Sequence, residues 1–306
     1  MMVSLCTEYW HFMLAQGVLT GSVMGLLLFP AMGAVMQYFD KKRASALGLV
    51  VAGSSVGGVV FPIALSKMLN DTSLSFGWSV RIMAFVMLPC LVFSCLTVRG
   101  RLPPRKTKFF IGKAFKQADF LLMTVGTFLA FVGMFPPLFF IPAYAESRGV
   151  EATMASYLVA IVNGASTFGR IIPGILADKY GRLNVLASAS IATGIVTSCL
   201  STATSVAGLV VYSVVFGFTS GAILSGASTA FTVTTKDPRE MGTYMGMGMG
   251  LISFAALIGP PICGALVDRY GGYLQVSLFG GIVSIAGGVV VLGVKAVTPH
   301  GLFGRV

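Results

Sequence analysis

Residues 174–182 read GILADKYGR, a short polar stretch between two apolar runs, one near 154–176 and one near 184–203. Each run is close to the roughly 20 residues that an α-helix needs to cross a hydrocarbon core ~30 Å thick. Gly174 allows two helices to approach closely, and Gly181 permits a tight turn. The stretch therefore predicts two membrane-spanning helices joined by a short polar loop.

The same pattern extends outward to the whole chain. Nine apolar runs are long enough to span a bilayer, and they lie near 11–37, 44–66, 79–98, 120–143, 154–176, 184–203, 207–232, 241–266 and 274–294. Of the 306 residues, 56% are hydrophobic and only 10% are charged. A soluble domain carries about 25% charged residues, so lipid is the expected solvent. The fold class is therefore an all-α integral membrane protein.

The distribution of basic residues predicts the topology. One set of alternate loops, with the C-terminal tail, carries 16 Lys and Arg residues, whereas the other set with its flanks carries 4. Basic loops stay on the cytoplasmic side, which places the C-terminus inside and the N-terminus outside. The net charge of +11 is thus explained by topology, and we expect the bilayer and not nucleic acid as the partner.

The longest connection divides the chain. Residues 99–119 hold seven basic residues and the pair Pro103-Pro104, and they separate three apolar runs from six. We interpret 99–119 as a cytosolic interdomain linker, 1–98 as three helices of an N-terminal bundle and 120–306 as a C-terminal six-helix bundle. The alternative is an ordinary solvated loop.

The loop at 174–182 resembles the G-x-L-x-D-x-x-G-R loop of the major facilitator superfamily. The matching positions are predicted to form a cytosolic gate, in which the Asp caps a helix end: Gly174, Asp178, Lys179, Gly181 and Arg182. A weaker echo, GALVDRYGG at 264–272, follows 90 residues later and is expected on the opposite side of the membrane. Inverted repeats of three spans produce such echoes.

A second stretch, YFDKKRASALGLVVAGSSVG at 38–57, resembles the fifth-helix signature of the monocarboxylate porter family, with mild departures at Ser45 and Val50. The residues that carry this resemblance are Tyr38, Phe39, Lys41, Lys42, Gly48, Gly53 and Gly57. Glu240-Met241-Gly242 and Gly259-Pro260-Pro261 are similar to fungal members. The G-x-x-x-G spacings at 17–25 and 53–57 predict helix contacts.

The resemblance implies twelve spans in two bundles. Because the first run at 11–37 matches the family's fourth helix, we expect an N-terminally truncated chain with about 9 of 12 spans. A genuine nine-span protein is the alternative. The resemblance also implies a location in the plasma membrane.

Arg170 is the one charged residue deep inside a predicted span, and Asn163, Ser166 and Thr167 share its helix face. A mid-membrane arginine costs at least ~2.5–3.5 kcal/mol, so such residues face a bundle interior or a wet cavity. One hypothesis is a clamp for a substrate carboxylate. The other is a structural arginine that bonds backbone carbonyls. The resemblance favours the clamp, although Ser166 stands where many members have an acid.

The sequence lacks the residue patterns of an enzyme. The two histidines, His11 and His300, lie at opposite ends, and no Gly-Lys-Ser/Thr phosphate loop is present. We expect no metal, no cofactor and no ATP-driven step. The first hypothesis is a secondary transporter of a small, monocarboxylate-like organic anion, possibly with a proton, by alternating access. The alternatives are efflux of a secondary metabolite and a non-transporting fragment.

Overall fold

The structure, a computed structural model, describes residues 1–39, 41–101, 110–235 and 240–297. Within these ranges it contains nine helical segments long and apolar enough to cross a membrane, at the places that the sequence predicts. The first is one continuous rod made of α1 (Tyr9–Phe12), the π-helix η2 (Met13–Thr20) and α2 (Gly21–Tyr38). Asp40, the linker residues 102–109, Lys236, Arg239 and Arg305, which entered the charge pattern, lie outside the described residues.

The other spanning helices follow in chain order, and the connections between them are short except for the one between α4 and α5. They are α3 (Arg43–Asn70), α4 (Phe76–Thr97), α5 (Ala118–Ser147), α6 (Ala152–Tyr180), α7 (Arg182–Ser198), α8 (Val206–Ala230), α9 (Met241–Tyr270) and α10 (Leu274–Val297). Short helical turns accompany them: η1 (Met2–Leu5), η3 (Gly112–Lys116), η4 (Leu200–Thr202) and η5 (Phe231–Val233). The linker therefore contains a helical turn, and α5 begins two residues before the predicted bundle boundary.

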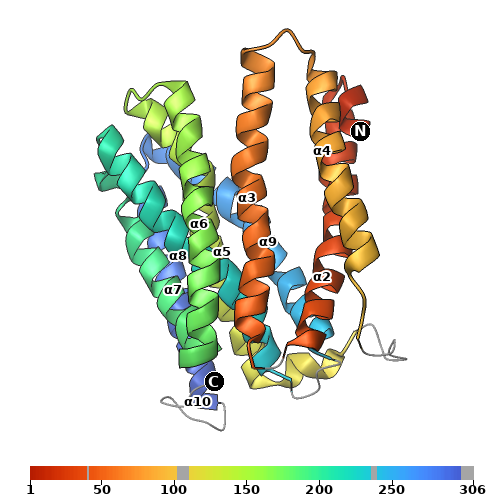
Figure 1. Cartoon of the computed structure of the whole chain (residues 1–306). Coiled ribbons are helices and arrows are strands. Elements are labelled where there is room, and N and C mark those ends of the chain that lie inside the picture. Colours follow the sequence, from red (N-terminus) through yellow and green to blue (C-terminus); the bar gives the residue numbers. More distant parts are fainter. Residues whose placement is uncertain (40, 102–109, 236–239, 298–306) are drawn as a thin grey trace.

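The N-terminus and the C-terminal end of α10 lie at opposite ends of the molecule, as the odd number of spans in the described residues requires (Figure 1). We call the end that carries 41–43, 99–101, 110–117, 179–182 and Lys295 the basic end. The C-terminal end of α10 lies there, and the loop between α3 and α4 lies at the opposite end (Figure 1).

Most of the packed core belongs to the helices after the linker, although Met32, Met36, Leu47 and Val51 of α2 and α3 also take part in it. The fully buried large side chains include Phe120, Met134, Tyr144 and Phe216, all on α5 or α8. By contrast, α4 buries only Ser79. Many exposed apolar side chains on α2 and α4 are what a lipid-facing surface presents.

Glycines let the helices of this core touch at the backbone. A Cβ built on Gly133 of α5 would lie 2.7 Å from the backbone nitrogen of Ser284 on α10. A Cβ on Gly194 of α7 would lie 2.6 Å from the carbonyl oxygen of Gly281. In lipid the hydrophobic effect does not drive helices together, so the close van der Waals packing that small residues allow stabilises such contacts.

The predicted G-x-x-x-G faces make no contact with another helix among the described residues. There, Gly21, Gly25 and Gly53 have nothing within 4 Å of a built Cβ, while Gly17 and Gly57 meet only side chains of their own helix. On α3 the reason is helical phase: Gly53 and Gly57 lie on the side opposite Gly48, and Gly48 faces α6. The contacting glycines of α3 are Gly48 and Gly58.

Candidate functional site

The predicted site residues of α6 meet α3 along one antiparallel contact, which we call the α3–α6 seam. It consists of Ala44, Ser45, Gly48, Val51, Ser54, Ser55 and Gly58 on α3 and of Asn163, Ser166, Arg170, Gly174 and Asp178 on α6. The three- and four-residue steps on both helices are those of one helix face against another. The seam joins the segment before the linker to the bundle after it.

Asp178 closes the seam at the basic end by capping α3. Its Oδ1 accepts a hydrogen bond from the backbone nitrogen of Ala44 at 3.0 Å, and its Oδ2 accepts one from the backbone nitrogen of Ser45 at 2.8 Å. The hydroxyl of Ser45 donates to the same Oδ2 at 2.6 Å. The first N–H groups of a helix lack partners within it and carry partial positive charge, so a carboxylate is the fitting cap.

One turn further along, the seam is tight enough to require glycine. A Cβ on Gly48 would lie 2.5 Å from the carbonyl oxygen of Arg170, and a Cβ on Gly174 would lie 2.9 Å from that of Ala44. Any larger residue at either position would push the helices apart. The close approach expected for Gly174 is thus present, and its partner is Gly48.

Arg170 lies in the middle of the seam and is only 6% exposed. Its Nη1 donates to the carbonyl oxygen of Val51 at 2.8 Å and to the hydroxyl of Ser54. Its Nε is buried and finds no hydrogen-bond partner among the described residues. In this conformation the guanidinium binds a backbone carbonyl of α3, which is the geometry of the structural alternative, and the buried Nε–H is left without a partner among the described residues.

The polar residues of α6 near Arg170 differ in whether they contact α3 or the backbone of their own helix. The Ser166 hydroxyl faces that of Ser55 at 3.5 Å, and both residues are buried. The Asn163 amide occupies the place of a side chain on Gly58, whose built Cβ would lie 2.7 Å from Asn163 Oδ1. Thr167 instead donates to the Asn163 carbonyl oxygen of its own helix at 3.2 Å. The structure therefore brings Asn163, Ser166 and Arg170, but not Thr167, into polar or close contact with α3.

The seam covers only part of α3. Every buried residue of this helix lies between Ala44 and Ser55, whereas α3 continues to Asn70. Asn163 sits about one third of the way along α6, which begins at Ala152. The two helices are thus joined from the basic end to about mid-height.

The remaining motif residues shape the basic end. Gly181 separates α6 from α7 with φ of 99°, a conformation that favours glycine. Arg182 donates to Thr232 Oγ1 at 2.6 Å, and Lys179 lies over the Tyr180 ring at 5.2 Å. A polar cavity of about 300 Å³ adjoins them, lined also by Lys41 and Asp178.

The other residues of the 38–57 signature have local roles here. Tyr38 and Phe39 are exposed at the end of α2, and Lys42 is the residue just before α3. The signature drew attention to the right helix, but the residues of α3 that touch α6 at polar contacts are Ser45, Val51, Ser54 and Ser55. The sequence signal for Ser45 is its place in the first turn after a basic loop. By comparison with the signature, Ser45 is only a departure.

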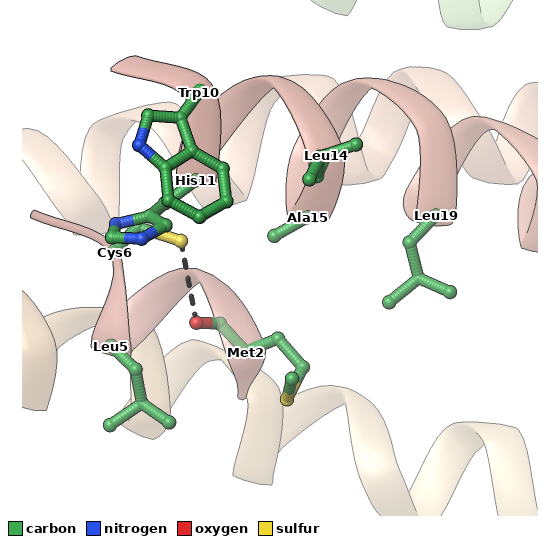
Figure 2. A pocket seen from close by; sticks show the side chains of 8 residues that line it. All are labelled: Met2, Leu5, Cys6, Trp10, His11, Leu14, Ala15 and Leu19. Atoms are coloured by element: carbon green, nitrogen blue, oxygen red, sulfur yellow. Dashed lines mark hydrogen bonds between the residues drawn. The ribbon is translucent and has the colours of Figure 1, made fainter. Parts of the chain in front are cut away.

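A second cavity, lined mostly by apolar residues, lies at the end of the molecule opposite the basic end. Figure 2 shows its lining, with a cavity volume of about 290 Å³; the residues are Met2, Leu5, Cys6, Trp10, His11, Leu14, Ala15 and Leu19. The one hydrogen bond drawn there joins Cys6 Sγ to the Met2 carbonyl oxygen at 3.5 Å. None of the seam residues lines this groove. In the part of the chain that is described, no group of three or more His, Cys, Asp and Glu residues could hold a metal ion.

In the described part of the chain, nine long apolar helices and a polar seam with a buried arginine are the features of a multi-pass membrane protein of the transporter class. The chain belongs to the Major Facilitator Superfamily, which it matches at residues 1–247 and 123–303. Among solved structures it is similar to the E. coli fucose:proton symporter (TM-score 0.69, 14% identity, 86% of this chain and 72% of that one). It is also similar to the human organic anion transporter MFSD10 (TM-score 0.66, 14% identity, 85% and 66%). At this identity the likeness concerns the fold.

Relatives in sequence include two fungal efflux proteins. The aspyridones efflux protein apdF of Emericella nidulans is 47% identical over 98% of this chain, and the chain spans 62% of its length. The agnestins efflux protein AgnL12 of Paecilomyces divaricatus is 42% identical over 95% of this chain, which spans 67% of that protein. The superfamily prediction is confirmed, but the relatives do not single out monocarboxylate porters.

Proposed function

We propose that this protein is an efflux transporter of a fungal secondary metabolite and works by alternating access. The carrying observation is the 47% identity, over 98% of this chain, to a protein that exports aspyridones. A substrate of the small monocarboxylate type, our first hypothesis from sequence, has no support among these relatives. The efflux alternative takes its place.

The α3–α6 seam would be the gate at the cytosolic side. Asp178 holds the end of α3 through three hydrogen bonds, while the half of α3 beyond Ser55 is not buried. Such an arrangement would close the transport pathway at the basic end and leave α3 and α6 apart at the opposite end. The excess of basic residues at the closed end supports a cytoplasmic position for it, with 1–98 and 120–306 as the two moving parts. The plasma membrane remains the proposed location.

Arg170 would bind an acidic group of the metabolite once the gate opens. Its contacts to Val51 and Ser54 both belong to α3, so parting of the helices frees the guanidinium. A charged donor left in a low-dielectric site then favours an anion strongly. Asn163 and Ser166 are on the same face and would border that anion, whereas Thr167 contacts its own helix backbone. A proton partner stays part of the proposal.

Gene deletion in the source organism tests the function. Intracellular and extracellular metabolites of the deletant and the parent are compared by mass spectrometry, and at least one metabolite should fall in the medium and rise in the mycelium. A copy carrying Arg170→Ala, inserted at the same level in the membrane, should fail to restore export. Unchanged distribution of every metabolite would instead favour a membrane protein that does not transport.

A further inference from the structure

The end of the linker forms a transverse segment at the basic end. Residues 110–117, which include η3, run across the ends of the spanning helices instead of along them (Figure 1, yellow). We call residues 110–117 the interfacial segment. The spanning helix α5 begins at Ala118, directly after it. The segment therefore lies where the spans leave the hydrocarbon.

The inner face of this segment is fixed to the bundle. Ala114 is fully buried, and Phe115 packs edge-on against Phe120 of α5 with ring centroids 5.4 Å apart. The hydroxyl of Tyr244 on α9 donates to Gln117 Oε1 at 3.3 Å. These contacts hold the segment in one orientation on the bundle.

The outer face combines an aromatic ring with two cations. Phe110 is 59% exposed and stacks on Phe115 at 5.6 Å. Lys113 and Lys116 are exposed, and neither makes a hydrogen bond or ion pair within the described residues. The sequence from 99 to 116 contains seven basic residues and no acidic one. The next acidic residue, Asp119, accepts a hydrogen bond from the backbone nitrogen of Phe120 and forms no ion pair with either lysine among the described residues.

We propose that the interfacial segment binds anionic phospholipid headgroups of the adjoining leaflet. Phe110 would sit among the headgroups and upper acyl chains, and Lys113 and Lys116 would contact the lipid phosphates and carboxylates. An exposed phenylalanine is unfavourable in water but suits the interface, which argues for lipid over a soluble anion. Juxtamembrane basic clusters attract anionic lipid for the same electrostatic reason.

A tryptophan reporter tests this binding in the reconstituted full chain. Phe110→Trp is made with Trp10→Phe and Trp78→Phe, so that position 110 carries the single indole. Vesicles contain either brominated phosphatidylcholine or brominated phosphatidylserine at equal fractions in a phosphatidylcholine background. We expect both lipids to quench emission, with the serine lipid quenching at least about twofold more, and we expect salt to reduce the difference.

Charge variants identify the binding residues. Lys113→Gln together with Lys116→Gln should remove the preference for the serine lipid and leave quenching by the choline lipid. Lys67→Gln, near the end of α3 remote from the segment, is the matched control and should change neither. Circular dichroism and gel filtration check that all variants fold. Equal quenching by both lipids, no quenching by either, or a preference that survives the double variant would each overturn the proposal.

Discussion

Two loops with similar sequences lie at opposite ends of the molecule. Both GILADKYGR at 174–182 and GALVDRYGG at 264–272 end a long helix with a glycine at positive φ, 99° at Gly181 and 66° at Gly271. In both, a cation lies over the adjacent tyrosine ring, at 5.2 Å for Lys179 and 5.7 Å for Arg269. The two loops therefore share the same local structure, a glycine at positive φ and a cation over a tyrosine ring.

Their tertiary contacts differ. Asp178 caps α3, whereas Asp268 is exposed and makes no hydrogen bond or ion pair among the residues the structure describes. Gly174 touches the backbone of α3, but a Cβ on Gly264 would meet only the tip of Phe140 at 4.0 Å. The aspartate of the repeated motif thus caps a second helix only where that helix presents its N-terminus. This difference is what a gate closed at one end and parted at the other would show.

Position 170 gives the largest expected effect. Ninety residues later in the repeat, Pro260 occupies the place of Arg170, so only α6 carries a buried cation above its loop. Arg170→Ala should lower export by at least ~100-fold, because the anion loses its charged partner, while insertion stays intact. Transport is measured as metabolite efflux, and insertion by membrane fractionation. Normal efflux by this variant would exclude the clamp.

Asp178 and Asp268 form a matched pair for the next test. Asp178→Ala removes the cap of α3 and three hydrogen bonds, so we expect roughly tenfold faster amide exchange at Ala44 and Ser45 and a comparable loss of export. Hydrogen exchange read by mass spectrometry measures the first effect. Asp268→Ala should leave both quantities unchanged. Equal effects of the two substitutions would show that the loops do not differ as the contacts indicate.

Two glycines on opposite sides of α3, Gly48 and Gly53, test the seam by steric hindrance. Gly48→Ala places a methyl group 2.5 Å from the Arg170 carbonyl oxygen, which we expect to weaken the seam by ~1–3 kcal/mol. Gly53→Ala, on the opposite side of the same helix, meets nothing within 4 Å and should be silent. Thermal unfolding of the purified variants in one detergent measures the difference. If Gly53→Ala were the more harmful, the two faces of α3 would be assigned wrongly.

Sequence reasoning found the spans and the loop but not the seam. Apolar run length is a local property, so helices such as α6 and α9 were placed within a few residues. The phase of α3 is not local: a G-x-x-x-G spacing favoured Gly53 and Gly57, and only the position of α6 shows that Gly48 and Gly58 make the contact. Likewise Arg170 was singled out by its charge, but its partners Val51 and Ser54 carry no sequence signal.

Ser45 offers the smallest and most specific test. Its hydroxyl is the third donor to Asp178, at 2.6 Å, in addition to the two backbone groups. Ser45→Ala leaves both backbone hydrogen bonds in place, so the latch should weaken by only ~0.5–1.5 kcal/mol. Amide exchange at Ala44 should then rise, but by less than the roughly tenfold increase expected for Asp178→Ala. In the Asp178→Ala background the same substitution should add almost nothing, because the hydroxyl has already lost its acceptor. Additive effects would mean that Ser45 acts through another contact, and the cap would then rest on the backbone of α3 alone.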